Sequence, residues 1–266
     1  MPSKTPNPAG EMPFLDHLEE LRWRILWSLL ALAIGAVAGF LLVHYGDMLQ
    51  VLFSPYRALF GEDQTLINLK PTDAFFITLK YGILIGFLLV FPIIVYHVWS
   101  FLAPALKKSE KRVIVPSLYM GLVLFVLGVL MAYYIALPIT LEFLVGFQTE
   151  IMSPQWTAQD YFGFTIQLLV AFGIIFELPV VVMILSVLGL VTPKFLRAKR
   201  RHAILLITIV AALISPGDVI MVTLLMMVPL IILYEFSIML SVMIYRKREE
   251  RVAAAADPPP DSVQAG

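Results

Sequence analysis

Residues 161–188 read YFGFTIQLLVAFGIIFELPVVVMILSVL, an apolar stretch in which the single charged residue is Glu177. A helix needs about 20 predominantly apolar residues, at about 1.5 Å each, to cross the hydrocarbon core of a bilayer. This stretch is long enough, so it predicts a membrane-spanning helix. The whole chain agrees, because 60% of its 266 residues are hydrophobic and 14% are charged, far from the composition of a soluble domain.

Five further apolar segments predict an all-α integral membrane protein with six transmembrane helices. They are Ile25–Tyr45, Ala74–Val98, Val113–Leu137, Ala203–Ile214 and a run that starts at Val219. The segment Ala203–Ile214 would be about 18 Å long as a helix, which is short for a span. We therefore expect a short fifth helix, followed by the turn Ser215–Asp218 and a short sixth helix.

Positive charges lie on one side of the predicted spans. Of the 19 Lys and Arg residues, all but Arg57, Lys70 and Lys80 precede span one, join spans two and three, join spans four and five, or follow span six. Because cytoplasmic loops collect Lys and Arg, both termini are predicted to be cytoplasmic. The chain then divides into an N-terminal segment with an interfacial helix (1–24), a six-span domain (25–245) and a cytoplasmic tail (246–266). Its Ala- and Pro-rich end leads us to expect a disordered tail.

Composition and motifs exclude several other classes of function. The net charge is zero and cysteine is absent, so we expect neither nucleic-acid binding nor a thiolate metal site. The four histidines are far apart in the sequence, which predicts no metal site, and no organic cofactor is implied. No G-x-S-x-G motif or glycine-rich phosphate loop occurs, so we expect no enzyme.

Glu177 is the most informative polar residue of the chain. A carboxylate within a span is costly unless it faces a protein interior or a wet cavity. Pro179 follows closely, and a proline inside a helix removes a backbone donor and kinks the axis. Two interpretations remain open: Glu177 serves function, or it is a protonated group that hydrogen-bonds a neighbouring helix for packing alone.

Two acids lie at the predicted cytoplasmic interface. Glu20 stands in an amphipathic helix before span one, where it pairs with Arg24 at i,i+4. Glu110 stands among the basic residues that follow the aromatic segment Trp99–Leu106. Two carboxylates on one side of the membrane can accept a pair of guanidinium groups, although an interfacial helix and an aromatic belt account for the same residues without binding.

Five motifs follow one another along the chain. They are His17–Arg24 (HLEELRWR), Tyr96–Leu106 (YHVWSFLAPAL) with Glu110 and Arg112, the set Phe125, Gly128, Tyr133 and Pro138, the segment Phe172–Pro179, and Ser215–Asp218 (SPGD). In this order they resemble the TatC family, the receptor subunit of the twin-arginine protein translocase, over nearly the whole chain.

The resemblance implies a cup-shaped bundle in the cytoplasmic (inner) membrane that binds the Arg-Arg pair of export signal peptides. Glu20 and Glu110 would contact the arginines, with Arg22 and Phe101 supporting that surface. Glu177 would face the concave side and meet single-span partner subunits of the TatA and TatB types. Folded cargo would cross by the proton-motive force, and we also expect lipid contacts and self-association.

Other motif positions are carried over as partner-binding or structural residues. They are Pro55, Trp99, Pro104, Arg112, Tyr133, Pro179, Pro216 and Asp218. The chain departs from the family pattern at His97, where Gln is common, and after Asp218, where the usual Ser and Gln are missing.

Two other functions remain open as alternatives to a translocase receptor. The first is a proton-coupled transporter of small molecules, with Glu177 as the single mid-span acid and the Pro179 kink as a gate. The second is a membrane scaffold that recognises no cargo. The transporter predicts proton flux that depends on Glu177, and the scaffold predicts that Glu20 and Glu110 can be neutralised without loss of export.

Overall fold

The computed structural model describes residues 14–62, 65–103, 108–146, 156–215 and 220–256. Its regular structure is helical, with an isolated parallel bridge between Ile67 and Thr157. In chain order the helices are α1 (Phe14–Tyr45), α2 (Met48–Phe60), α3 (Asp73–Leu102), α4 (Lys108–Met131), the π-helical turn η2 (Ala132–Ala136), α5 (Leu137–Gly146), α6 (Ala158–Ile175), α7 (Leu178–Val187), α8 (Pro193–Ala198), α9 (Arg200–Ile214) and α10 (Ile220–Ala256). The expected all-α class is confirmed.

Five helical segments are long and apolar enough to cross a membrane. They are Asp16–Tyr45, Asp73–Leu102, Ile114–Gly146, Ala158–Val187 and Val222–Lys247. Each contains or overlaps a span that hydropathy predicts. The sixth element, α9, has 15 residues, or about 22 Å of helix, so the expectation of a short fifth helix is confirmed.

The sixth helix differs from the expectation that it would be short. α10 contains 37 residues and runs to Ala256, beyond residue 246, where the tail was expected to begin. The segment after Lys247 reads REERVAAAA, which consists almost entirely of strong helix formers without glycine or proline. The helix therefore continues past the apolar segment.

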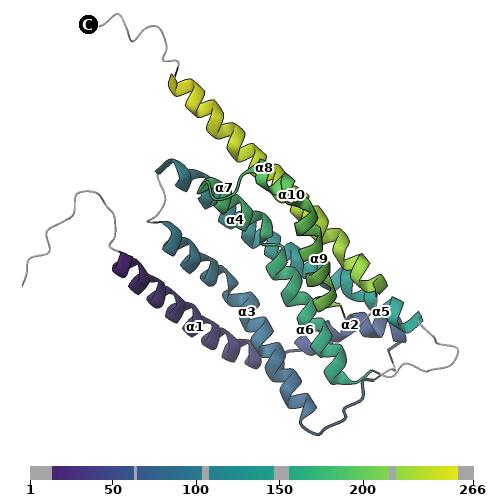
Figure 1. Ribbon diagram of the computed structural model, residues 1–266. Coiled ribbons are helices and arrows are strands. Elements are labelled where there is room, and N and C mark those ends of the chain that lie inside the picture. The colour runs from purple at the N-terminus through teal and green to yellow at the C-terminus, as the bar shows by residue number, and fades with distance from the viewer. Residues whose placement is uncertain (1–13, 63–64, 104–107, 147–155, 216–219, 257–266) are drawn as a thin grey trace, which may run out of the picture.

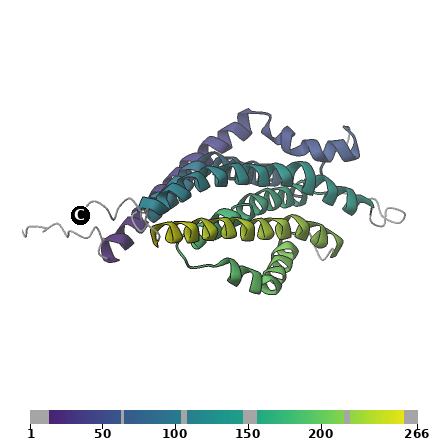
Figure 2. The same cartoon turned by 90° about the horizontal axis from the view of Figure 1, so that it is seen from above.

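The helices pack as a hairpin beside a larger group. α1 lies along α3, while α4 packs on α6 and α7, and α10 packs on α7 and α9 (Figures 1 and 2). α6 also contacts α3 and so joins the two parts. α1 begins and α10 ends at the same end of the bundle, called here the terminal end; α3 and α6 begin at the opposite end, called the far end (Figure 1).

A glycine seam holds α1 against α3. Gly35 and Gly39 on α1 face Gly82 and Gly86 on α3 so closely that a Cβ at Gly82 would lie 2.6 Å from the Cα of Phe40. Small residues four apart allow membrane helices to approach closely. Both G-x-x-x-G motifs are visible in the sequence, and they are the signal that would have predicted this pairing.

Candidate functional site

An aromatic stack at the terminal end joins the start of α1 to the end of α3. The rings of His17 and Phe101 lie with centroids 4.3 Å apart and planes 12° apart. Trp99, two residues before Phe101, packs on the buried pair Ile114 and Val187. Phe101 therefore lies beside the HLEELRWR motif, and its supporting role stays a prediction.

Glu20 lies one helical turn after His17. Its Oε1 accepts a hydrogen bond from Nη2 of Arg24 at 3.0 Å, so the predicted i,i+4 pair is confirmed. Its Oε2 is buried and has no hydrogen-bond partner among the described residues; Nδ1 of His17 lies 3.9 Å away. Burying a carboxylate oxygen without a hydrogen-bond donor costs free energy. Oε2 of Glu20 is therefore available to accept a hydrogen bond from a ligand.

The other predicted residues of this surface are placed less completely. Arg22 is exposed on α1. Glu110 and Arg112 belong to the first turns of α4, but their side chains lie outside the described part, as do Pro104, Pro216 and Asp218 altogether. The pairing of Glu20 with Glu110 therefore stays a prediction.

The predicted kink of the fourth span is a break between two helices. α6 ends at Ile175, and Glu177 precedes the first residue of α7, with Pro179 in the first turn of α7. Proline suits the first turn of a helix because its missing N–H has no intrahelical partner there. The sequence FELP thus ends one helix and begins the next in the middle of the span, and Glu177 lies at that junction.

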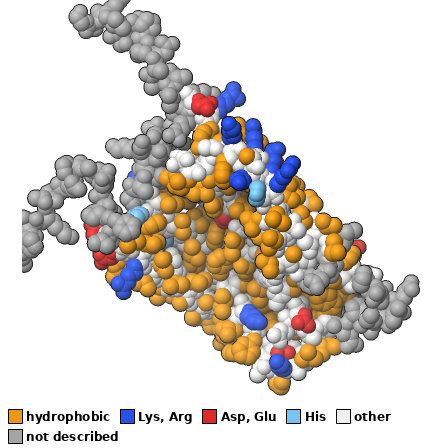
Figure 3. Space-filling model, viewed as in Figure 1, with side chains coloured by type: hydrophobic (Ala, Val, Ile, Leu, Met, Phe, Trp, Pro, Cys, Tyr) orange, Lys and Arg blue, Asp and Glu red, His pale blue; other side chains and the backbone are white. Residues whose placement is uncertain are grey.

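Glycine on the neighbouring helix makes room for the Glu177 carboxylate. A Cβ at Gly121 of α4 would lie 2.7 Å from Oε2 of Glu177. Oε1 of Glu177 is buried and has no hydrogen-bond partner among the described residues. Figure 3 shows the apolar surface hollowed between the α1–α3 hairpin and the larger group, with an acidic side chain visible in the hollow. The Glu177 carboxylate can therefore accept a hydrogen bond from a donor on another molecule.

Two motif residues serve the far end of the bundle. Pro55 lies inside α2. Tyr133, in η2, donates its hydroxyl hydrogen to the carbonyl of Val51, and Tyr161 of α6 donates to the carbonyl of Leu52 at 2.7 Å. Since a proline at position 55 leaves the carbonyl four residues earlier without its helical donor, the Tyr133 hydroxyl satisfies that carbonyl of Val51. Tyr133 thus helps to anchor α2 beside Pro55, while a partner-binding role for either residue stays a prediction.

Sequence reasoning missed a second acid within a span. Glu235 lies in the segment Val222–Lys247, and its Oε2 accepts a hydrogen bond from Nη2 of Arg200, at the start of α9, at 2.7 Å. The view of Glu177 as the single mid-span acid is therefore wrong. Glu235 was readable in the sequence, but its partner was not, because 35 residues separate the two.

These features define a polytopic α-helical membrane protein with acidic side chains at the terminal end and at the break of one span. Comparison with known proteins agrees: the family model described as Sec-independent protein translocase protein (TatC) matches residues 16–229. A TatC protein of Aquifex aeolicus is 38% identical over 88% of this chain and 97% of its own length. One of Carboxydothermus hydrogenoformans is 39% identical over 88% and 94%. A crystal structure of a twin-arginine translocase receptor, TatC, superposes with a TM-score of 0.77 at 38% identity, covering 86% of this chain and 99% of that one.

The chain belongs to the TatC family of Sec-independent protein translocase proteins. The described helices, five of them long and apolar enough to cross a membrane, share the fold of that solved structure.

Proposed function

We propose that this chain is the receptor and core subunit of a twin-arginine translocase of the cytoplasmic membrane. It binds the Arg-Arg pair of signal peptides on its cytoplasmic face and, with single-span partner subunits, exports folded proteins by the proton-motive force. Export makes and breaks no covalent bond, so the proposal includes no catalytic residue. The terminal end of the bundle is the cytoplasmic face, because the basic loops lie there.

The observation that carries the proposal is the half-satisfied Glu20 carboxylate. Arg24 already occupies Oε1 with a guanidinium, at 3.0 Å, and Oε2 is buried without a hydrogen-bond partner in the described part of the chain. The site is thus built to accept arginine chemistry. The first arginine of a signal peptide would donate to Oε2, and the second would reach Glu110.

Selectivity for arginine follows from the shape of the guanidinium. Its planar fork donates two parallel hydrogen bonds to one carboxylate, whereas a lysine ammonium acts as a point charge. The bases next to Glu110 in the sequence, Lys107, Lys108, Lys111 and Arg112, would repel cations that do not satisfy both acids. A Lys-Lys peptide should therefore bind much more weakly than an Arg-Arg peptide.

The test is photocrosslinking of an Arg-Arg signal peptide to the membrane-embedded protein. Wild type is compared with Glu20→Gln, with Glu110→Gln and with a Lys-Lys peptide. The matched control is Glu19→Gln, which removes the same charge from the exposed neighbour of Glu20. Crosslinking should fall about tenfold or more in both site variants, because a charged group loses its partner, and should be unchanged in the control. Equal crosslinking in wild type and all three variants would reject the acid pair and favour the scaffold hypothesis.

Glu177 supports the second part of the proposal, the contact with partner helices. Its buried Oε1 has no hydrogen-bond partner among the described residues, so a polar side chain of a partner helix can donate to it within the membrane. Because the contact is a hydrogen bond, Glu177→Gln should keep more partner crosslinking than Glu177→Ala. Proton uptake into liposomes that depends on Glu177, without partners or cargo, would instead favour the transporter.

A further inference from the structure

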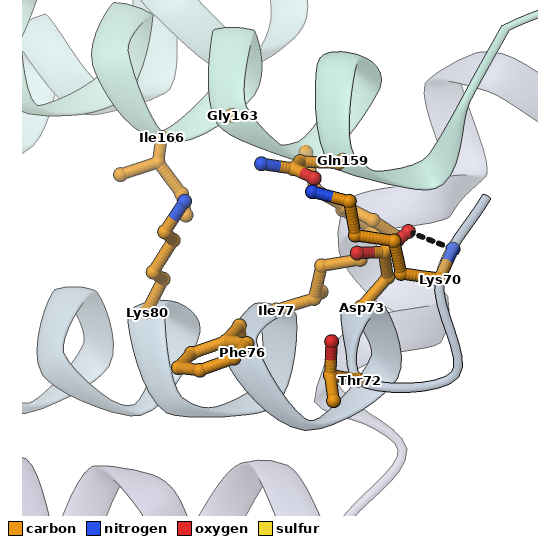
Figure 4. A pocket seen from close by; sticks show the side chains of 10 residues that line it. Lys70, Thr72, Asp73, Phe76, Ile77, Lys80, Gln159, Gly163 and Ile166 are labelled. Atoms are coloured by element: carbon orange, nitrogen blue, oxygen red, sulfur yellow. Dashed lines mark hydrogen bonds between the residues drawn. The ribbon is translucent and has the colours of Figure 1, made fainter. Parts of the chain in front are cut away.

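A cavity opens between two parallel helices at the far end of the bundle. Its volume is about 260 Å³, and it lies between the first turns of α3 and α6 (Figure 4). From α3 it is lined by Asp73, Phe76, Ile77 and Lys80, and from α6 by Gln159, Phe162, Gly163 and Ile166. Each set has the spacing i, i+3, i+4 and i+7, which places its members on one face of a helix. The cavity is therefore the space between two facing stripes.

Two lysines point into this space. Lys70, in the loop before α3, and Lys80, two turns into α3, both extend toward α6 (Figure 4). Neither forms an ion pair with a described residue. They are two of the three basic residues on this side of the membrane, where Lys and Arg are normally scarce. A lysine within a span needs an anion or an aqueous exit for its ammonium group.

The acid beside them is already engaged. Asp73 is buried, and its Oδ2 accepts hydrogen bonds from the backbone N–H of Lys70 at 2.9 Å and of Leu69 at 3.2 Å. With two lysines and one carboxylate, the lining carries a net positive charge. The starts of α3 and α6 add the positive ends of two helix dipoles. An anion is therefore the ligand that this electrostatic environment favours.

The walls of the cavity are held in place independently of any ligand. The backbone N–H of Ile67 donates to the carbonyl of Trp156 at 3.1 Å, and the N–H of Ala158 donates to the carbonyl of Ile67 at 2.9 Å. These bonds tie the loop that carries Lys70 to the start of α6. Such a preformed site binds with a smaller ordering cost than lysines on a free loop.

Part of the cavity lining and of the helix surface near it is apolar. Phe76 and Ile166 form part of the lining. Phe75, Leu79 and Ile83, on the first three turns of α3, are exposed. A charged head in the cavity would thus have acyl chains beside it on the helix surface. A free anion would gain nothing from these side chains, whereas a lipid would bury them.

We propose that this cavity binds the phosphate of an anionic phospholipid from the far-end leaflet, held by Lys70, Lys80 and the Gln159 amide. The head group of the lipid would fill the cavity between the first turns of α3 and α6. Basic pockets between membrane helices are suited to such head groups. This inference is independent of signal-peptide binding, which involves the opposite end of the bundle.

The test is native mass spectrometry of the full chain in a neutral detergent, with titration of phosphatidylglycerol, phosphatidylcholine or inorganic phosphate. The variants are Lys70→Gln, Lys80→Gln and Gly163→Leu. A Cβ at Gly163 would meet no atom within 4 Å, so leucine fills the cavity without displacing backbone. Arg57→Gln is the matched control, because Arg57 is the third basic residue on this side and its guanidinium lies over the ring of Phe53, 4.9 Å from its centre.

Wild type should bind a first phosphatidylglycerol more tightly than phosphatidylcholine. Each lysine variant should lose about fivefold in affinity, Gly163→Leu should lose the preference, and Arg57→Gln should keep it. Equal loss in Arg57→Gln, or no loss in the lysine variants, would overturn the site. Lysine-dependent binding of inorganic phosphate that phosphatidylglycerol cannot displace would overturn the lipid as its ligand.

Discussion

At the scale of single residues, Arg24 competes with the arginine of a signal peptide for the Glu20 carboxylate. An i,i+4 ion pair on a helix contributes about 0.5 kcal/mol, and a ligand guanidinium must share or displace it. Arg24→Gln should therefore raise the affinity for an Arg-Arg signal peptide about twofold, measured by fluorescence anisotropy. Arg197→Gln, which removes an exposed charge elsewhere, is the control. A lower affinity in Arg24→Gln would mean that Arg24 positions Glu20 for the peptide.

Gly121 controls the room available to Glu177. An alanine Cβ at position 121 would lie 2.7 Å from Oε2 of the carboxylate, so the flexible side chain must rotate away. Gly121→Ala should therefore reduce partner crosslinking at this site in the direction of Glu177→Ala, while Glu177 itself is intact. When Gly121→Ala and Glu177→Ala are combined, the double variant should lose no more partner crosslinking than Glu177→Ala alone. Additive losses would show that Gly121 acts through helix packing instead.

The glycine seam between α1 and α3 makes a prediction at the element scale. A methyl group at Gly39 would lie 2.6 Å from the backbone nitrogen of Gly86, and overpacking of this kind costs about 2 kcal/mol. Gly39→Ala should lower the free energy of unfolding by about that amount, measured by SDS titration with tryptophan fluorescence. Gly146→Ala, where a Cβ would meet nothing within 4 Å, should change it little. Equal effects would exclude close helix approach as the cause.

The pair Arg200–Glu235 links α9 to α10. Both side chains are 48% exposed, and an exposed pair that water reaches contributes about 1 kcal/mol or less. A double-mutant cycle with Arg200→Gln and Glu235→Gln should therefore give a coupling energy of up to about 1 kcal/mol in the same unfolding assay. A much larger coupling would mean that lipid excludes water from this pair.

Elements and contacts differ in how well the sequence predicts them. Apolar length predicted all the long spans, because a bilayer demands about 20 apolar residues wherever a helix crosses. It did not predict that α1 continues unbroken from Phe14 or that α10 reaches Ala256. Those ends are set by local helix propensity outside the membrane.

The sequence predicted the acids of the candidate site but not the contacts between distant segments. Glu177 and Glu20 are conspicuous because charge next to apolar sequence is costly. The stacking of His17 on Phe101 and the pair Arg200–Glu235 join segments far apart in the chain, which hydropathy does not address. Such contacts depend on which helices are neighbours, and this required the structure.

The whole molecule can be oriented experimentally because it contains no native cysteine. Single cysteines replace Asn68, in the far-end loop, and Lys247, near the terminal end of α10. In intact cells a membrane-impermeant maleimide should label Asn68→Cys and leave Lys247→Cys unlabelled until the membrane is opened. The reverse pattern would contradict the orientation expected from the basic loops.

The glycine seam also bears on the order in which the chain is built. Synthesis proceeds from the N-terminus, and early parts of a chain can fold before later parts exist. α1 packs chiefly on α3, so its principal neighbour is complete at Leu102, before any later helix has been made. The first two spans can therefore pair in the bilayer while the ribosome is still translating the remainder. The later helices then assemble, through α6, onto a hairpin that is already closed.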